Sequence, residues 1–155
     1  MIRLRGKDVT YGELWFDEEL EYPLTDILIC RQRLQPWPVG RCNEFFTLVV
    51  DITRDEPTLL GALGKQSRYH ISRAATKDCP SSVLLDEPVC ALDVFCGFYD
   101  CFAAAKALKS CDRRWCAKIA ILGRLILSNV AQEGEVRVWH AYLISGGHAR
   151  LLLSA

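Results

Sequence analysis

The chain has 155 residues, of which half are apolar and a quarter are charged, and its 19 lysines and arginines balance 19 aspartates and glutamates. This composition is typical of a soluble globular protein of about one domain's length. Zero net charge excludes a general electrostatic attraction to nucleic acid or to an anionic membrane, so we expect no nucleic-acid partner and only local binding sites. No apolar run reaches the length of a bilayer span, and we expect no membrane span.

Eight cysteines are spread along the chain, and no two of them form a C-x-x-C pair. The charged segment Met1 to Arg5 is not followed by the apolar stretch of a secretory signal. We therefore predict a cytoplasmic protein whose cysteines are reduced and serve as small core residues, with no metal site.

The first part of the chain predicts short strands. Val9–Tyr11 and Leu14–Phe16 read as two of them, and Asp26–Arg31 as a third. The loop Gln35–Gly40, with two prolines and a glycine, excludes regular structure. Phe45–Ile52 is rich in β-branched and aromatic residues on both faces, which predicts an internal strand.

An amphipathic helix is predicted next. Thr53 and Glu56 have the spacing of a capping box, and Pro57 falls in the first turn. An apolar stripe at helical period should face the core, formed by Leu60, Leu63, Ser67, Ile71 and Ala74. The opposite arc is basic and polar, formed by Lys65, Arg68, Tyr69, Ser72, Arg73 and Thr76. This basic face serves either solubility or binding.

The sequence of the second half of the chain predicts a strand, two helices and three more strands. Ser82–Leu85 reads as a strand, and a helix starts at Glu87-Pro88. That helix has an aromatic stripe formed by Leu92, Phe95, Phe98, Tyr99 and Phe102. A third helix should start near Ser110 or Asp112 and end at Gly123. The last strands are predicted at Leu125–Ala131, Val136–Ser145 and Ala149–Ser154, separated by tight turns.

Two-residue turns in both hairpins would place Leu127 opposite His140, and His140 opposite Leu153. One face would then carry Leu125, Leu127, Asn129, His140, Tyr142, Ile144, Leu151 and Leu153. Neither face of this predicted sheet is polar, so we expect other parts of the protein to cover both faces. Asn129, His140 and Tyr142 would form a polar group in which His140 takes a proton from an amine and Tyr142 returns one to a leaving thiolate. The alternative is a satisfied core histidine.

Two motifs resemble GNAT-like acyltransferases of the FemAB type. The segment from Lys65 to Ala74 is similar to the family's lysine-rich turn followed by T/S-R-Y-x-I-R-R-A, with departures at His70 and Ser72. Trp139 to Leu143, followed by Gly146 to Ala155, is similar to V-x-H-x-Y-L-x-x-G-x-x-A-R-L-L-x-S-A. The resembling segments are Phe45 to Asp78 and Asp86 to Ala155.

The resemblance implies an α/β (α+β) GNAT-like fold with a mixed, mainly antiparallel sheet and flanking helices. Residues 1–80 would hold the first strands and the basic helix, and residues 81–155 the first part of the GNAT-like domain. The implied catalytic residues are His140 and Tyr142. The implied substrate-binding residues are Arg68, Tyr69, Arg73, Asn129, Trp139, Arg150 and Ser154.

The implied reaction is transfer of an acyl or aminoacyl group from acyl-CoA to a small-molecule or peptide-like amine. In the family the acyl-donor site lies beyond the position of Ala155, so we expect an incomplete fold that is inactive as it stands. An uncovered edge at the apolar strand Arg150–Ser154 should favour self-association. The alternative function is a non-catalytic binding module that uses the basic helix and an exposed sheet edge.

Overall fold

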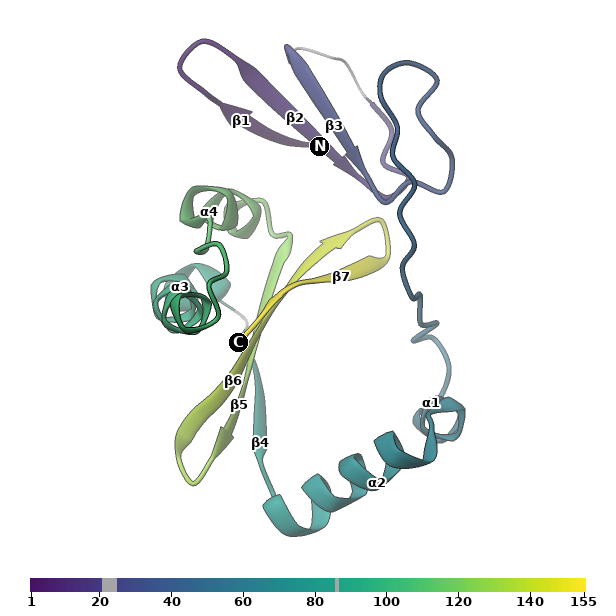
Figure 1. Ribbon diagram of the computed structural model, residues 1–155, viewed down its shortest axis with the longest axis vertical. Helices are drawn as coiled ribbons and strands as arrows, with labels where there is room; N and C mark the ends of the chain where they lie inside the picture. The colour runs from purple at the N-terminus through teal and green to yellow at the C-terminus, as the bar shows by residue number, and fades with distance from the viewer. Residues whose placement is uncertain (21–24, 86) are drawn as a thin grey trace.

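Figure 1 shows a computed structural model of the chain, which describes residues 1–20, 25–85 and 87–155. Asp86, at which the second resembling segment starts, lies outside the described residues. The described residues form two β-sheets, four α-helices and one π-helical turn. The predicted α+β class with mainly antiparallel strands is therefore confirmed.

The first sheet is built from the amino-terminal segment and has the strand order β1-β2-β3. Its strands are Ile2–Arg5, Thr10–Trp15 and Ile27–Arg31. β1 and β2 are antiparallel, whereas β3 lies parallel to β2. The amide and hydroxyl of Thr10 donate to the Asp26 carboxylate at 2.8 and 2.7 Å, which ties the start of β3 to β2. The two short strands expected at residues 9–16 are one continuous strand, and β1, with its alternating apolar and basic residues, is additional.

The second sheet has the order β4-β5-β6-β7, and all of its neighbouring strands are antiparallel. Its strands are Ser81–Leu85, Leu125–Gln132, Glu135–Ser145 and His148–Ser154. Each confirms a strand that was predicted from the sequence. β6 is an inner strand between β5 and β7, and β7 lies at an edge, as expected.

Helices α3 and α4 cover one face of the second sheet (Figure 1). They span Pro88–Ala105 and Arg113–Ile121. α3 begins directly after Glu87, as predicted. Asp112 caps α4, because its carboxylate accepts a hydrogen bond from the Trp115 amide at 3.0 Å. The chain leaves α4 through Gly123, whose φ of +66° suits glycine.

The apolar core lies between these helices and the sheet. Phe95 is fully buried and packs edge to face against Trp139, with ring centroids 6.0 Å apart. The aromatic stripe expected on α3 is confirmed: Leu92, Phe95 and Tyr99 are buried, and Phe98 and Phe102 pack against them. The helix layer is therefore held to the sheet by aromatic and aliphatic contacts.

Among the described residues, α3 is the one helix whose length and composition would suit a membrane span. The length of this apolar helix differs from the prediction that no apolar segment of the chain is long enough to span a bilayer. Part of its apolar surface is used in the core, where Leu92, Phe95, Cys96, Tyr99 and Ala103 are buried.

The segment between the two sheets differs most from the prediction. Residues 45–52, expected as an internal strand, form no regular structure, and Phe46 and Leu48 are 90% and 88% exposed. A strand is stable when its backbone groups pair with a neighbour, and no described strand pairs with this segment. Its β-branched composition is therefore not sufficient to make it a strand.

The predicted single helix is divided into α1, α2 and the π-helical turn η1, which together we call the arm. They span Glu56–Ala62, Lys65–Arg73 and Ala74–Asp78. Asp55, not Thr53, caps α1, since its carboxylate accepts from the Thr58 amide at 3.2 Å. The chain turns extended at Leu63, with ψ of 149°, and this separates α1 from α2. No residue of the arm is buried, so the predicted apolar stripe faces no core.

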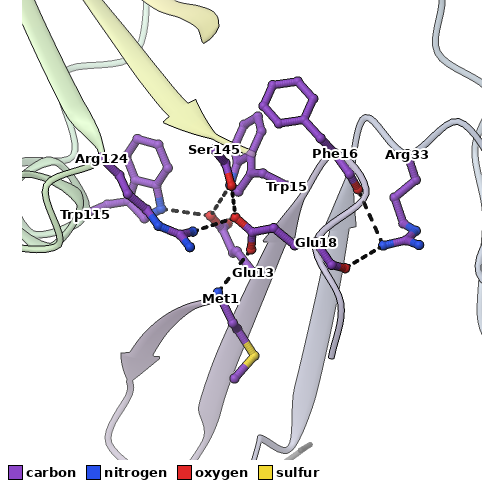
Figure 2. A network of polar contacts seen from close by, with 9 residues as sticks. All are labelled: Met1, Glu13, Trp15, Phe16, Glu18, Arg33, Trp115, Arg124 and Ser145. Atoms are coloured by element: carbon purple, nitrogen blue, oxygen red, sulfur yellow. Dashed lines mark hydrogen bonds and ion pairs between the residues drawn. The ribbon is translucent and has the colours of Figure 1, made fainter. Parts of the chain in front are cut away.

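Two carboxylates join the first sheet to the second sheet and its helices (Figure 2). Glu13 of β2 is buried and accepts a hydrogen bond from the indole nitrogen of Trp115 in α4 at 2.8 Å. Glu18 pairs with Arg124 at 2.6 Å and accepts a hydrogen bond from the Ser145 hydroxyl. Segments far apart in the sequence are thereby held together by charge-assisted hydrogen bonds.

The Glu18 carboxyl is largely shielded from solvent, yet its pKa is lowered. Burial raises the pKa, but the Ser145 hydroxyl, the Met1 ammonium at 3.0 Å and the Arg124 guanidinium lower it and prevail. The folded state therefore favours the charged carboxylate. Its contribution to stability is complete above the usual carboxyl pKa of 4.5 and is lost as the pH falls through the lower, folded-state pKa.

The cysteines differ in part from the prediction that they are core residues. Cys96, Cys111 and Cys116 are buried, and Cys30 is half-buried. Exposed thiols occur at Cys42, Cys79, Cys90 and Cys101. Cys90 and Cys101 lie on α3, Cys79 directly follows the arm, and Cys42 lies in the irregular segment before it, where the structure offers no apolar layer to cover them.

Replacing Phe95 with Ala should lower the free energy of unfolding by about 3–5 kcal/mol, because it empties the centre of the core beside Trp139. Urea-induced unfolding followed by circular dichroism measures the change. The matched control is Val94→Ala on the same helix, which is 65% exposed and should change stability by about 0.5 kcal/mol or less. Equal effects of the two substitutions would contradict this description of the core.

Replacing Glu18 with Gln should lower the free energy of unfolding by about 1–3 kcal/mol at neutral pH, because Arg124 loses a shielded charged partner. The difference from the unmodified chain should shrink as the pH falls from 4.5 through the lower, folded-state pKa, below which the carboxyl group is protonated in both states. Urea titrations across this pH range measure it, with the exposed neighbour substitution Glu19→Gln as the control. If Glu18→Gln lowers the free energy of unfolding by the same amount at acid and at neutral pH, the charge of Glu18 does not stabilise the contact between the sheets.

Candidate functional site

Two tight turns relate β6 to its neighbours. Glu133 and Gly134 join β5 to β6 with φ of +53° and +81°, and Gly146 and Gly147 join β6 to β7 with φ of +54° and +77°. Positive φ at both central residues is typical of a type I′ turn, which matches the twist of a hairpin. Both predicted two-residue turns are confirmed.

The register nevertheless differs from the prediction, because each hairpin contains an irregularity of the β-bulge kind. In the first hairpin the pairing shifts by one residue beside Val130, and Arg137 is left out of the register. In the second it shifts beside Ala141, and Leu152 is left out. A bulge places one extra residue in one strand, so every later pair moves by one.

The shift changes the neighbours of His140. It pairs with Ser128 of β5 and Ser154 of β7, not with Leu127 and Leu153 as expected. Directly opposed residues point to the same side of a sheet, so a serine hydroxyl lies on either side of the imidazole. Ser128 is a residue that the sequence analysis did not find, because its position depends on the bulge.

Alternation along β6 places His140 and Tyr142 on the face opposite to the helices. Trp139 and Ala141, the residues of the other face, are buried beneath α3 and α4. The rings of His140 and Tyr142 are neighbours, with centroids 6.1 Å apart. Asn129 pairs with Trp139 and so lies on the helix side. The expectation that Asn129 shares a face with His140 and Tyr142 is therefore wrong.

His140 is half-buried, and its ring nitrogen Nδ1 is shielded from solvent. No described residue makes a hydrogen bond to this atom. Leaving a shielded polar atom without a partner costs about 1–3 kcal/mol, so we expect Nδ1 to bond a water molecule or a bound group. A free imidazole nitrogen can accept a proton or a hydrogen bond from a bound group. The arrangement differs from that of a core histidine satisfied by its neighbours.

Arg150 does not lie beside His140 and Tyr142. It pairs with Leu143, whose side chain is buried on the helix side of the sheet. Its guanidinium donates to the Thr47 hydroxyl at 3.0 Å and lies 5.6 Å from the centre of the Phe45 ring. Arg150 therefore holds the extended segment against β7, and it points away from His140.

The predicted residues of α2 lie on the exposed arm. Arg68 donates to the carbonyl oxygen of Gly61 at 3.2 Å, so it covers the open end of α1. Arg73 forms an ion pair with Asp78 at 3.9 Å, and Tyr69 is 60% exposed. The arm stands apart from β6 in Figure 1, so these side chains are not gathered with the histidine.

Two hollows in the described part of the chain lie elsewhere. A groove of about 690 Å³ lies beside α3, where Phe98 and Phe102 line it together with Arg137 of β6 and Ala155, which follows β7. A smaller hollow of about 190 Å³ lies between the β1–β2 turn and the start of α4. Neither includes His140 or Tyr142. The candidate site is therefore an uncovered sheet face rather than a closed pocket.

No protein-family model matches the chain, and no curated protein is similar enough to it to count as a match. The family resemblance therefore depends on the two sequence motifs alone. The chemistry of the site is inferred from its own geometry, which offers a proton acceptor, a phenol and two hydroxyls on one sheet face.

Proposed function

We propose that this chain forms the acceptor side of a GNAT-like, FemAB-type N-acyltransferase that transfers an acyl or aminoacyl group to an amine. The observation that carries the proposal is the position of His140. It lies on the uncovered face of β6, and no described residue bonds its shielded Nδ1. An amine must lose a proton when it attacks an acyl carbon, and an imidazole on the substrate-facing side of the sheet is suited to accept it.

In the proposed reaction the amine nitrogen forms a bond to the acyl carbon, and the bond between that carbon and the leaving group breaks. His140 accepts the proton that the amine loses. Tyr142, the neighbour of His140 on the same face, donates a proton to the leaving group and then regains one from the imidazolium. Ser128 and Ser154 border the site with hydroxyls that suit a small polar or peptide-like acceptor.

The described residues do not fit the pyrophosphate of an acyl-CoA near this site. Such a group is held by free amides at a helix N-terminus. α3 begins after Glu87, and the Asp112 carboxylate already occupies the first turn of α4 by accepting from Trp115. α2 begins at Lys65 on the arm, which stands apart from β6 in Figure 1. The described residues around His140 therefore suit the amine acceptor rather than coenzyme A.

The test is to incubate the full chain with a panel of primary amines and two acetyl donors, acetyl-CoA and a simple acetyl thioester without a nucleotide. Mass spectrometry of the acetylated amine measures turnover. His140→Ala should lower the rate by about 10²–10⁴-fold, the range for a lost general base. It should leave stability nearly unchanged, because Nδ1 has no described partner to lose.

The control is His70→Ala, a histidine on the exposed arm, which should keep full turnover. Two results would contradict the proposal. One is a folded chain that forms no product above the uncatalysed rate with either donor. The other is a His140→Ala variant that keeps the turnover of the unmodified chain.

A second candidate is a non-catalytic binding module, and the exposure of the arm favours it. The arm carries lysines at positions 65 and 77, and its residues pack against no core. An acidic partner would find basic side chains there and an edge strand at β7.

For this candidate, the double substitution Lys65→Glu and Lys77→Glu should weaken binding of an acidic peptide at least about tenfold, since it reverses two charges on the arm. Titration calorimetry at low salt measures the affinity. Lys106→Glu, after the end of α3, reverses one charge outside the arm and should change the affinity little. Unchanged binding in the double variant would exclude the arm as the docking surface.

A further inference from the structure

Three cysteines meet inside the helix layer, where neither the proposed reaction nor the binding module uses them. Cys96 belongs to α3, Cys111 lies in the connection between the helices, and Cys116 belongs to α4. The sulfur of Cys111 lies 3.3 Å from that of Cys96 and 3.6 Å from that of Cys116. Their exposed fractions are 0%, 9% and 1% in chain order, so Cys111 is the least buried of the three.

The backbone around Cys111 is held in place by an ion pair. The Asp100 carboxylate of α3 accepts from the Cys111 amide at 2.8 Å and pairs with Arg113 of α4 at 3.0 Å. The hydrogen bond and the ion pair of Asp100 hold the connection against α3, and they keep the Cys111 sulfur beside that of Cys96. A disulfide bond is about 2 Å long, so the two sulfurs need to approach by little more than 1 Å.

We propose that Cys96 and Cys111 form a reversible disulfide in the presence of a small disulfide oxidant such as oxidised glutathione. Cys111, the least buried of the three, attacks one sulfur of the oxidant and releases one glutathione thiol. Cys96 then attacks the Cys111 sulfur of the mixed disulfide and releases the second glutathione thiol. Two protein thiols are oxidised, one glutathione disulfide is reduced to two thiols, and the two cysteine protons leave with the glutathione.

The surroundings of the thiols make this a slow reaction that speeds up with pH. Burial, together with the contact to Cys111, raises the pKa of Cys96 to about 12. The contact to Cys116, together with burial, raises the pKa of Cys111. The charged groups that face the pair are Asp100, which opposes ionisation, and Arg113, which favours it at Cys96. The thiolate fraction, and with it the rate of oxidation, should rise about tenfold per pH unit without a plateau up to about pH 9.

The bond would lock the two helices that cover the sheet. It would close the loop from α3 to the start of α4, and α4 carries Trp115, the partner of Glu13 in the junction. Closing a loop of about 15 residues removes freedom from the unfolded chain. The melting temperature should therefore rise by about 5–10 °C on oxidation and fall back on reduction with dithiothreitol.

The test uses the full chain, incubated with oxidised glutathione at pH 8, alkylated, and digested with trypsin and chymotrypsin, which place the three cysteines on separate peptides. Mass spectrometry should find a peptide pair that joins Cys96 to Cys111. Cys96→Ala and Cys111→Ala should each remove both this pair and the shift in melting temperature. Cys101→Ala, an exposed cysteine of the same helix, should keep both, and Cys116→Ala should also keep both.

Circular dichroism of the reduced proteins shows whether Cys96→Ala and Cys111→Ala fold. If one of them folds poorly, the other still tests the proposal. A Cys111 to Cys116 pair in place of the Cys96 pair would overturn the proposal. So would a digest that contains only mixed disulfides with glutathione at the exposed cysteines, or an oxidised protein with the linked peptides but an unchanged melting temperature.

Discussion

The alternation of side chains along β6 is the constraint on which both the core and the candidate site depend. Trp139 and Ala141 point to the helices and are buried, whereas His140 and Tyr142 point to the uncovered face. Because the period of a strand is two residues, a shift of one position would move the imidazole into the core and the indole out of it. The two bulges beside β6 decide which serines flank the histidine, so backbone irregularities shape the chemistry of the face.

The same strand connects the site to the junction between the sheets. Its last residue, Ser145, donates to Glu18, and Glu18 also holds Arg124 at the start of β5. A carboxylate taken out of water needs such partners, because an unpaired buried charge is very costly. The first sheet is thereby attached through a small number of specific polar contacts, together with Trp15, which joins the apolar core. The site and the junction share strand β6.

The helix layer and the arm differ in burial. α3 and α4 are fastened to the sheet by aromatic packing and to each other around three thiols. The arm has no buried residue, and the segment before it exposes large apolar side chains such as Phe46. Exposed apolar surface of this extent is typical of segments that contact another molecule or another part of a larger assembly. The helix-covered face thus holds the core, while the arm and the segment before it lie exposed.

Much of the second half could be predicted from the sequence, because its signals are local. The strands between Leu125 and Ser154, both tight turns and the starts of α3 and α4 follow from residues within a few positions of each other. The prediction failed at residues 45–52, where a strand-like composition found no neighbouring strand. It also failed for the neighbours of His140, which two bulges changed by one residue.

The sequence by itself therefore determined the helices and strands of the second half of the chain and that His140 and Tyr142 share a face. The tertiary structure alone decided which serines flank the histidine, that Asn129 faces the helices, and that Glu13 and Glu18 join the sheets. The physical reason is the range of the forces involved. Backbone preferences act over a few residues, whereas strand pairing and the burial of charge require partners that are brought together when the whole chain folds.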